Sequence, residues 1–156
     1  RAGFERRAMM PSHRVIQRVG VIGWPIEHSL SPAMHNAAFK HLKLPYIYLP
    51  FHVTSENLPS AVNSIRALSL SGVNITVPHK EAIISLLDDL HESARRCRAV
   101  NTVINLNGIL IGYNTDGEGF VASLRQGAPG WDPAAGPAAA PIAHMKFRIS
   151  KAPLPA

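Results

Sequence analysis

Residues 19–44, VGVIGWPIEHSLSPAMHNAAFKHLKL, decide the fold, because they carry a strand, a turn and a helix in succession. The apolar run at 19–23 ends in glycine, which predicts a short buried strand. Ser31 followed by Pro32 predicts a helix start, with serine as the N-cap and proline at the first helical position. The helix should end near Leu44, which precedes another proline. This stretch therefore predicts the first strand–helix unit of an α/β domain.

The same alternation continues downstream from this stretch. Further strands are predicted at 46–52, 72–77, 99–104 and 109–113, and further helices at 55–68, 78–87 and 117–124. Pro50 favours an edge position for its strand, and Asn107-Gly108 indicates a hairpin between the last two strands. The order predicts an α/β three-layer sandwich whose sheet is mainly parallel and contains one antiparallel hairpin.

Composition and charge favour a globular domain over a nucleic-acid-binding or membrane protein. The chain of 156 residues is 46% hydrophobic and 17% charged, as in one globular domain. The net charge of +6 lies in the flanks, because residues 19–143 hold eight basic and nine acidic residues. We therefore expect no nucleic-acid partner. No apolar run reaches the ~18 residues of a membrane span, so no membrane partner is expected. Cys97 is the only cysteine, which excludes an intrachain disulfide and fits the expected cytoplasmic location.

Three segments are expected along the chain. Residues 1–18 form a basic flexible N-terminal segment, and residues 19–126 form the folded domain. Residues 127–156 form a linker and disordered tail, since thirteen of the positions in 127–141 are alanine, proline or glycine. The G-x-G-x-x-A pattern beginning at Gly117 is too weak to predict a dinucleotide site, because no further strand follows it. The histidines show no metal-ligand spacing, so no metal site is expected.

The first candidate cluster is the hydroxyl pair Ser29 and Ser31, which directly precedes a helix. Helix N-termini favour anions, so a carboxylate could accept hydrogen bonds from both hydroxyls. The alternative is a helix cap without any ligand.

The second candidate cluster lies between Asn74 and Lys80 and includes Thr76. A lysine in the first turn of the predicted helix is electrostatically unusual, because the helix N-terminus disfavours a cation. That position favours release of its proton, which suits a general acid or base. The alternative is a solvated surface lysine.

The third candidate cluster comprises Asn101 and Thr102 on one strand, with Asn114, Thr115 and Asp116 after its hairpin partner. The predicted hairpin would bring both segments to one edge of the sheet, where Asp116 could pair with Lys80. Such side chains suit the hydroxyls of a polyol. The alternative is turn chemistry, because N-T-D-G is also a good turn sequence.

The clusters together resemble the shikimate dehydrogenase family. The resemblance rests on four motifs in the family's order, over residues 19–126: GWPIEHSLSPAMHN at 23–36, NITVPHK at 74–80, AVNT at 99–102 and GYNTDG at 112–117. It implies the amino-acid-dehydrogenase-like N-terminal domain, with shikimate and 3-dehydroshikimate as substrates and NADP as cofactor. Residues 19–126 would then be the shikimate-binding catalytic domain.

The resemblance also implies roles for individual residues. Ser29 and Ser31 would bind the substrate carboxylate, and Lys80, paired with Asp116, would exchange a proton with the reacting oxygen while NADPH delivers hydride. The ring hydroxyls and the carbonyl would be held by Thr76, Asn101, Thr115 and Asp116.

The family's second domain, which binds the nucleotide, has no counterpart after residue 126. We therefore expect a truncated chain that is inactive alone and contains no cofactor-binding residues. Three further readings remain open: a shikimate-binding module without catalysis, a fragment of a quinate/shikimate dehydrogenase, and an unstable gene fragment with no selected function. Serine at position 31 favours shikimate over quinate.

Overall fold

A computed structural model of the chain describes residues 15–128 and 130, in two compact units that divide after Asp116. The strands are β1 (Gln17–Gly23), β2 (Tyr46–His52), β3 (Gly72–Ile75), β4 (Asp89–Leu90), β5 (Thr102–Leu106) and β6 (Ile109–Tyr113). The helices are α1 (Ser31–His41), α2 (Leu58–Ala67), α3 (Glu92–Cys97) and α4 (Asp116–Gly127), with 3₁₀ turns η1 (Ser55–Asn57) and η2 (Ala82–Leu86). Nearly all of α4 belongs to the second unit. Most of the segments expected at 1–18 and 127–156 lies outside the described residues, which leave out 1–14, 129 and 131–156.

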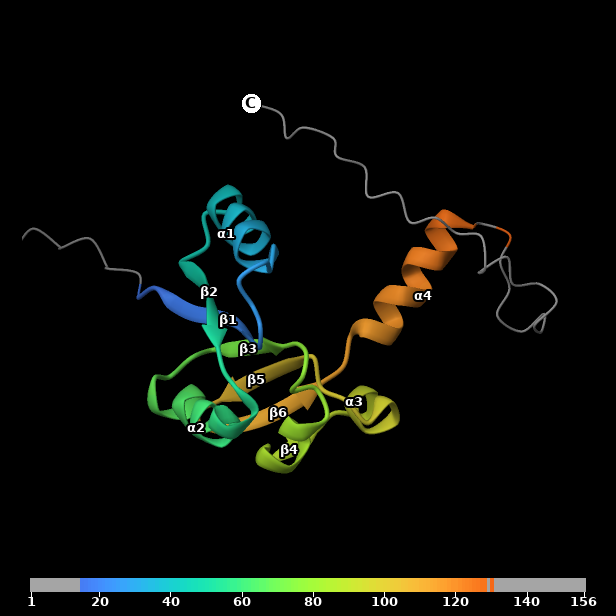
Figure 1. The fold of residues 1–156 in the computed structure, drawn as a ribbon. Coiled ribbons are helices and arrows are strands. Elements are labelled where there is room, and N and C mark those ends of the chain that lie inside the picture. The colour runs from blue at the N-terminus through green and yellow to red at the C-terminus, as the bar shows by residue number, and fades with distance from the viewer. Residues whose placement is uncertain (1–14, 129, 131–156) are drawn as a thin grey trace, which may run out of the picture. The chain divides into compact units, whose positions relative to one another are not determined.

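The first unit is built on a six-stranded sheet in the order β2-β1-β3-β5-β6-β4 (Figure 1). Only β5 runs against the other strands, pairing antiparallel with β3 and with β6. The expected class, a mainly parallel sheet with one antiparallel hairpin, is therefore confirmed. Strand β2 lies at an edge, as Pro50 predicted, and the hairpin turns at Asn107 and Gly108, which both have positive φ.

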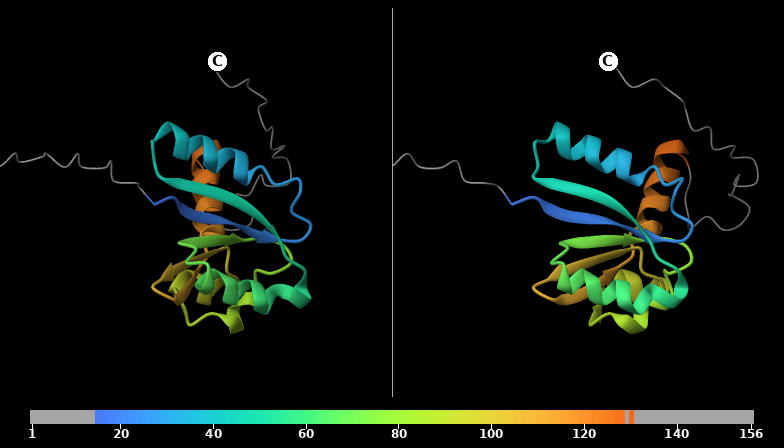
Figure 2. Two further views of the ribbon diagram at one scale, coloured as in Figure 1. Left: turned by 90° about the vertical axis from the view of Figure 1, so that its left-hand side faces the viewer. Right: turned by 60° about the vertical axis from the view of Figure 1, so that its left-hand side comes forward.

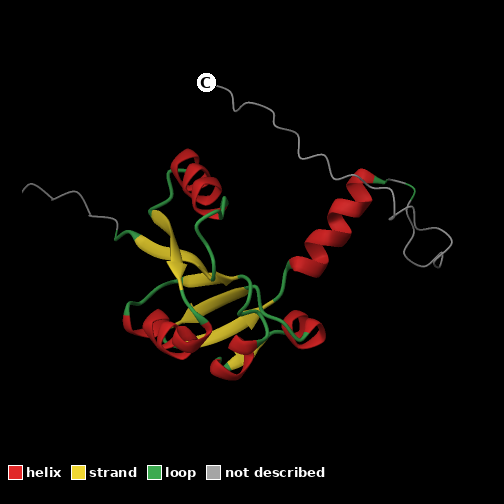
Figure 3. Ribbon diagram, in the orientation of Figure 1, coloured by secondary structure: helices red, strands yellow, loops and turns green. Residues whose placement is uncertain are grey.

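Helices cover both faces of this sheet, which gives the three predicted layers (Figures 2 and 3). On one face, α2 and η2 cover the larger core, which includes Ile22, Ile65 and Ile83. On the other face, α1 lies over β1 and β2 above a small cluster containing Val21 and Tyr48. Consecutive residues Val21 and Ile22 face opposite cores because side chains alternate along a strand.

The helix predicted at 78–87 is wrong. The structure has a turn followed by the short 3₁₀ element η2. The main-chain carbonyl of Lys80 accepts a hydrogen bond from the Val100 N–H at 2.7 Å, so it is used across the fold rather than along a helix. The apolar pattern instead serves to bury Ile83. The helix-terminus reason given for an unusual lysine at position 80 therefore does not apply.

Other boundaries differ by smaller amounts. Strand β1 begins at Gln17 and β5 only at Thr102, while β4 and α3 fall in a charged stretch for which no element was predicted. Helix α1 includes Ser31 as its first residue, so Leu30 is its N-cap rather than Ser31. Among the described residues, none of the helices is both long and apolar enough to span a membrane.

Candidate active site

The centre of the candidate site is an ion pair between Lys80 and Asp116. Lys80 lies in the loop after β3, and Asp116 lies three residues beyond the end of β6. These parallel strands end at the same edge of the sheet, which brings the Lys80 Nζ to 2.6 Å from the Asp116 Oδ2. The two side chains are 33% and 53% exposed, so the pair remains open to a ligand. The predicted pairing is therefore present in the structure.

Asn101 connects this pair to Thr115. It precedes β5, the reversed strand, and so reaches the same edge of the sheet. Its Nδ2 donates to the Asp116 Oδ1 at 2.8 Å and to the Thr115 Oγ1 at 2.9 Å, while its Oδ1 accepts the Thr115 N–H at 3.1 Å. The buried amide of Asn101 thus binds one carboxylate oxygen of Asp116, and the other oxygen, Oδ2, pairs with Lys80.

The electrostatics of the cluster favour a charged Asp116. Partial burial acts to raise the pKa of its carboxyl, but the hydrogen bonds from Lys80 and Asn101 and the lysine charge outweigh that effect. The pKa of Asp116 consequently lies below its ordinary value. A carboxylate held in this state can orient the ammonium group of Lys80 towards a ligand.

The loop that carries Lys80 is anchored by its neighbour His79. This side chain is 1% exposed, and its Nε2 lies 2.6 Å from the carbonyl oxygen of Val53, so it donates there. The buried histidine thus anchors the loop to the segment after β2. Thr76 lies at the start of this loop, where its N–H donates to the Ile22 carbonyl at 2.9 Å. Its methyl group approaches Gly23 so closely that a Cβ there would lie 2.4 Å away.

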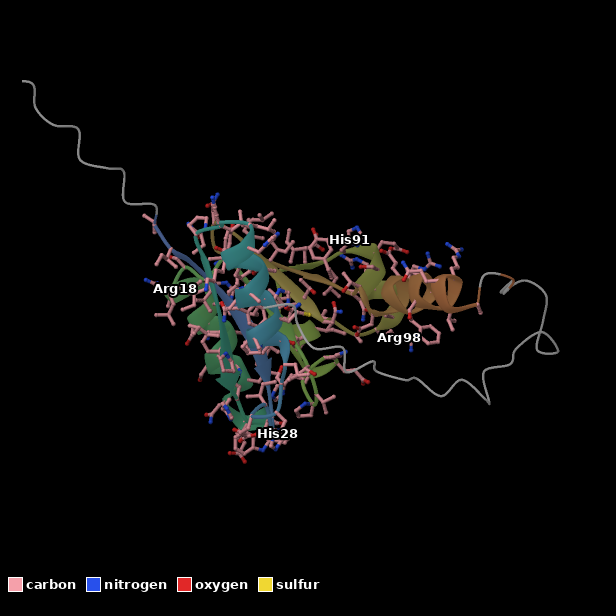
Figure 4. All side chains as sticks on the ribbon, turned by 90° about the horizontal axis from the view of Figure 1, so that it is seen from above. Arg18, His28, His91 and Arg98 are labelled. Carbon is pink, nitrogen blue, oxygen red and sulfur yellow. The ribbon has the colours of Figure 1, made fainter. Side chains whose placement is uncertain are left out.

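Ser29 and Ser31 lie after β1, in a group separate from Lys80 and Asp116. The loop that holds them follows β1 and the labelled His28, and it leads into α1 (Figure 4). The Ser29 Oγ accepts the Ser31 N–H at 3.3 Å, so Ser29 contributes to capping α1. No contact joins either serine directly to Lys80, Asp116 or Thr76 within the described part of the chain. A ligand would have to span the two groups.

Among the polar residues that connect to this cluster, the sequence-based prediction missed Tyr48. Tyr48, on β2, donates from its hydroxyl to the Asn74 Oδ1 at 2.7 Å. Asn74 in turn donates to the Thr102 Oγ1 at 3.1 Å. Asn74 and Thr102 were visible in the quoted motifs, whereas Tyr48 was seen only as a strand former. Its role depends on strand order, for which the local sequence carries no signal.

The described residues do not fit a dinucleotide. Gly117 and Gly119 lie inside α4, which begins at Asp116, so the G-x-G-x-x-A pattern forms no phosphate-binding turn before a helix. The same residues contain no cluster of three or more histidine, cysteine, aspartate or glutamate side chains able to hold a metal ion.

The fold and this cluster together are typical of a class: α/β domains that bind a small polar molecule at the carboxyl ends of their strands, beside an acid–base pair. Residues 21–103 match the model of the shikimate dehydrogenase substrate binding domain. The chain belongs to this family.

Named relatives agree with this assignment. The chain is 54% identical over 112 residues to the shikimate dehydrogenase (NADP(+)) of Desulforamulus reducens, covering 72% of this chain and 38% of that protein. It resembles the crystal structure of the Thermus thermophilus enzyme in complex with NADP(H) and shikimate, with a TM-score of 0.68 and 42% identity over 71% of this chain and 42% of that one. The chain thus spans about two fifths of the length of these relatives.

A related fold occurs in a protein with another named activity. The ligand-free 5-ketofructose reductase of Gluconobacter sp. strain CHM43 matches with a TM-score of 0.69 and 38% identity, covering 73% of this chain and 41% of that chain. The fold alone therefore does not select the substrate.

Proposed function

We propose that this chain binds shikimate and 3-dehydroshikimate, as the substrate-binding part of an NADP-dependent shikimate dehydrogenase. The observation that carries this proposal is the cluster of Lys80, Asp116 and Asn101 at one sheet edge, with the 2.6 Å ion pair open to solvent. A lysine held by a carboxylate can give a proton to an oxygen that gains negative charge, and can take it back in the reverse direction.

Each side chain has a proposed role in binding. The hydroxyls of Ser29 and Ser31 hold the substrate carboxylate at the N-terminal end of α1, where main-chain N–H groups also favour an anion. Asp116 orients Lys80 towards the reacting oxygen. The remaining ring oxygens are bound by Thr76, Asn101 and Thr115. The Desulforamulus reducens relative is named an NADP(+) enzyme, and such a cofactor would accept hydride in its oxidised form and supply it in its reduced form.

We further propose that this polypeptide alone does not turn shikimate over. Hydride transfer requires the nicotinamide to be held against the substrate, and the described residues offer no dinucleotide site. A spectrophotometric assay should show no shikimate-dependent NADPH formation. A normal enzymatic rate would contradict this expectation without affecting the binding proposal.

Titration of shikimate into the purified chain, followed by saturation-transfer NMR, tests the binding proposal. We expect saturable binding that Ser31→Ala weakens on the order of tenfold, since a hydrogen bond to a charged group contributes ~1.5–3 kcal/mol. Ser85→Ala is the matched control, because the Ser85 hydroxyl donates only locally, to the Ala82 carbonyl at 3.4 Å. No saturable binding to a folded chain, or equal effects of both variants, would refute the proposed site.

A second candidate function is binding of a polyhydroxylated ketone without a carboxylate. The resemblance to a 5-ketofructose reductase favours it. Such a ligand makes no charged contact with the serine pair, so its affinity should survive Ser31→Ala while remaining sensitive to Lys80→Met. Parallel titrations with shikimate, quinate and 5-ketofructose distinguish the three ligands.

The place and partners of the protein remain predictions. A cytoplasmic location fits Cys97, which is exposed and free in the structure. A chain confined to the cytoplasm should be recovered in that fraction after gentle lysis, without bound nucleic acid.

A further inference from the structure

We propose that Tyr48 is a positioning residue, which acts through Asn74 and Thr102 to fix the amide of Asn101 and hence the carboxylate of Asp116. Four hydrogen bonds connect these side chains in sequence: Tyr48 to Asn74 at 2.7 Å, Asn74 to Thr102 at 3.1 Å, Thr102 to Asn101 at 3.0 Å and Asn101 to Asp116 at 2.8 Å. We call these five side chains the relay. It ends on the carboxylate that holds Lys80.

The orientation of the Asn74 amide follows from obligatory partners. The main-chain carbonyl of Asn101 can only accept, and it lies 3.3 Å from Asn74, so the Asn74 atom that faces it must be the nitrogen. Asn74 Oδ1 then faces the Tyr48 hydroxyl, which must donate. Burial raises the pKa of Tyr48 to about 12, although a hydrogen bond from Ser31 acts in the opposite direction. The phenol therefore keeps its proton at neutral pH.

The other end of the relay is fixed in the same way. The main-chain N–H of Thr115 can only donate, so the Asn101 atom that it faces at 3.1 Å must be the oxygen. Thr102 accepts from Asn74 and gives its own proton to that oxygen. The Asn101 nitrogen must then face Asp116. Every donor in the relay consequently points towards the carboxylate.

Tyr48 is itself held from several sides. Asn36, on α1, both accepts from the Tyr48 N–H and donates to its carbonyl, each at 2.9 Å. The ring of Tyr48 stacks on His35 with 4.3 Å between centroids and 9° between planes. Only 4% of the residue is exposed. These contacts hold the hydroxyl of Tyr48, the first donor of the relay, in place.

Loss of the Tyr48 hydroxyl should therefore change the pKa of the Asp116 carboxyl. Asn74 Oδ1 would be left without its donor, and the side chain would turn to find another one. Thr102 would lose the partner that directs its proton to Asn101. A less firmly held Asn101 amide donates less effectively to Asp116, and weaker donation raises the pKa of a carboxyl.

The test is the titration of the Asp116 side-chain carboxyl by carbon-13 NMR on the free chain. We expect Tyr48→Phe and Thr102→Val each to shift the midpoint upward, with the larger shift for Thr102→Val because it is adjacent to Asn101. The double variant should shift it no further than Thr102→Val alone, because both substitutions interrupt one chain of bonds. Thr102→Ser keeps the hydroxyl and should leave the midpoint unchanged.

Two controls separate positioning from general loosening. Tyr46→Phe alters a neighbouring tyrosine that packs on Phe39 with 5.3 Å between ring centroids, and should not move the midpoint. Asp88, which binds the Leu110 N–H and Arg66, should titrate unchanged in every variant. An unshifted Asp116 midpoint in folded Tyr48→Phe, or additive shifts in the double variant, would overturn the proposal.

One further readout does not depend on any variant. If the variants fail to fold, the wild-type chain decides, because the hydroxyl protons of Tyr48 and Thr102 must exchange slowly with water; rapid exchange of both would refute the relay. The inference concerns the site of the proposed function, but its titration uses no shikimate. A shifted Asp116 midpoint without shikimate binding would leave the relay standing and remove the proposed substrate.

Discussion

Two aspartates of this domain have nearly the same surroundings and different chemical capacities. Asp116 pairs with Lys80 at 2.6 Å and accepts the Asn101 amide at 2.8 Å. Asp88 pairs with Arg66 at 2.7 Å and accepts the Leu110 main-chain N–H at 2.7 Å. The Leu110 N–H, together with Arg66, holds the pKa of Asp88 below its ordinary value. For Asp116, burial acts to raise the pKa, but Lys80 and Asn101 outweigh it and the pKa is again lowered.

The difference lies in the cation and in what else it binds. Arg66 also donates to the Gly108 carbonyl at 2.9 Å, so it fastens α2 to the hairpin turn, and a guanidinium does not release its proton in proteins. The ammonium group of Lys80 can lose a proton, and its recorded side-chain contact within the described residues is Asp116 alone. An ion pair is thus structural or reactive according to whether its cation can exchange a proton and reach a ligand.

The largest expected difference between the pairs concerns ligand binding. Lys80→Met should weaken shikimate binding on the order of tenfold to a hundredfold, because a charged hydrogen bond is lost. Arg66→Met should leave the affinity unchanged. The two dissociation constants can be measured by NMR titration on chains of verified fold. Equal losses in both variants would show that the comparison is mistaken.

The free energy of unfolding should show the opposite order: Arg66→Met should lower it more than Lys80→Met. Arg66→Met removes a part-buried hydrogen bond to Gly108 and should lower the free energy of unfolding by about 1 kcal/mol. Lys80→Met removes a solvent-exposed pair and should change it by less than ~0.5 kcal/mol. Urea unfolding followed by circular dichroism measures both values. A larger loss for the lysine variant would mean that Lys80 is mainly structural.

The smallest expected effect is on acid stability. Both carboxyls have a lower pKa in the folded chain than in the unfolded chain, where an aspartate titrates near ~3.9. Each therefore contributes stability that is fully present above that value and is lost as the pH falls through the folded pKa. Asp116→Asn and Asp88→Asn should each flatten the decline in stability below pH ~4. An unchanged slope in either variant would show that its carboxyl is not perturbed.

Much of the fold could be predicted because its signals are local. The Asn107-Gly108 turn adopts positive φ at both residues, as the hairpin signal requires, and Pro50 marks an edge strand. The helix at 78–87 does not form because the Val100 N–H, distant in sequence, donates to the Lys80 carbonyl that a helix would have used, and because the buried His79 side chain is held by the Val53 carbonyl. Tertiary hydrogen bonds thus outweighed the helical spacing of the apolar residues in this segment.

Part of the candidate site could likewise be predicted from local signals, and part could not. Pairing of Lys80 with Asp116, and the approach of Asn101, followed from strand ends and one hairpin. The relay did not, because it needs the register of β2 on β1, of β1 on β3 and of β3 on β5 at once. Tyr48 lies opposite Val19, and Asn74 lies opposite Val21, only in the folded sheet, an arrangement that no local pattern contains.

The hairpin turn also determines which changes of chain length the site can tolerate. Register in the β5–β6 pair places Thr102 opposite Tyr113, next to Asn101 and close to Asp116. A slip of one residue would send every side chain of the slipped strand to the opposite face of the sheet. A residue inserted at Asn107-Gly108 must therefore form a bulge at the turn. Otherwise it shifts the register of the whole hairpin, and the shift reaches the ion pair. Variation in the length of this loop is consequently constrained by the chemistry at the far end of its strands.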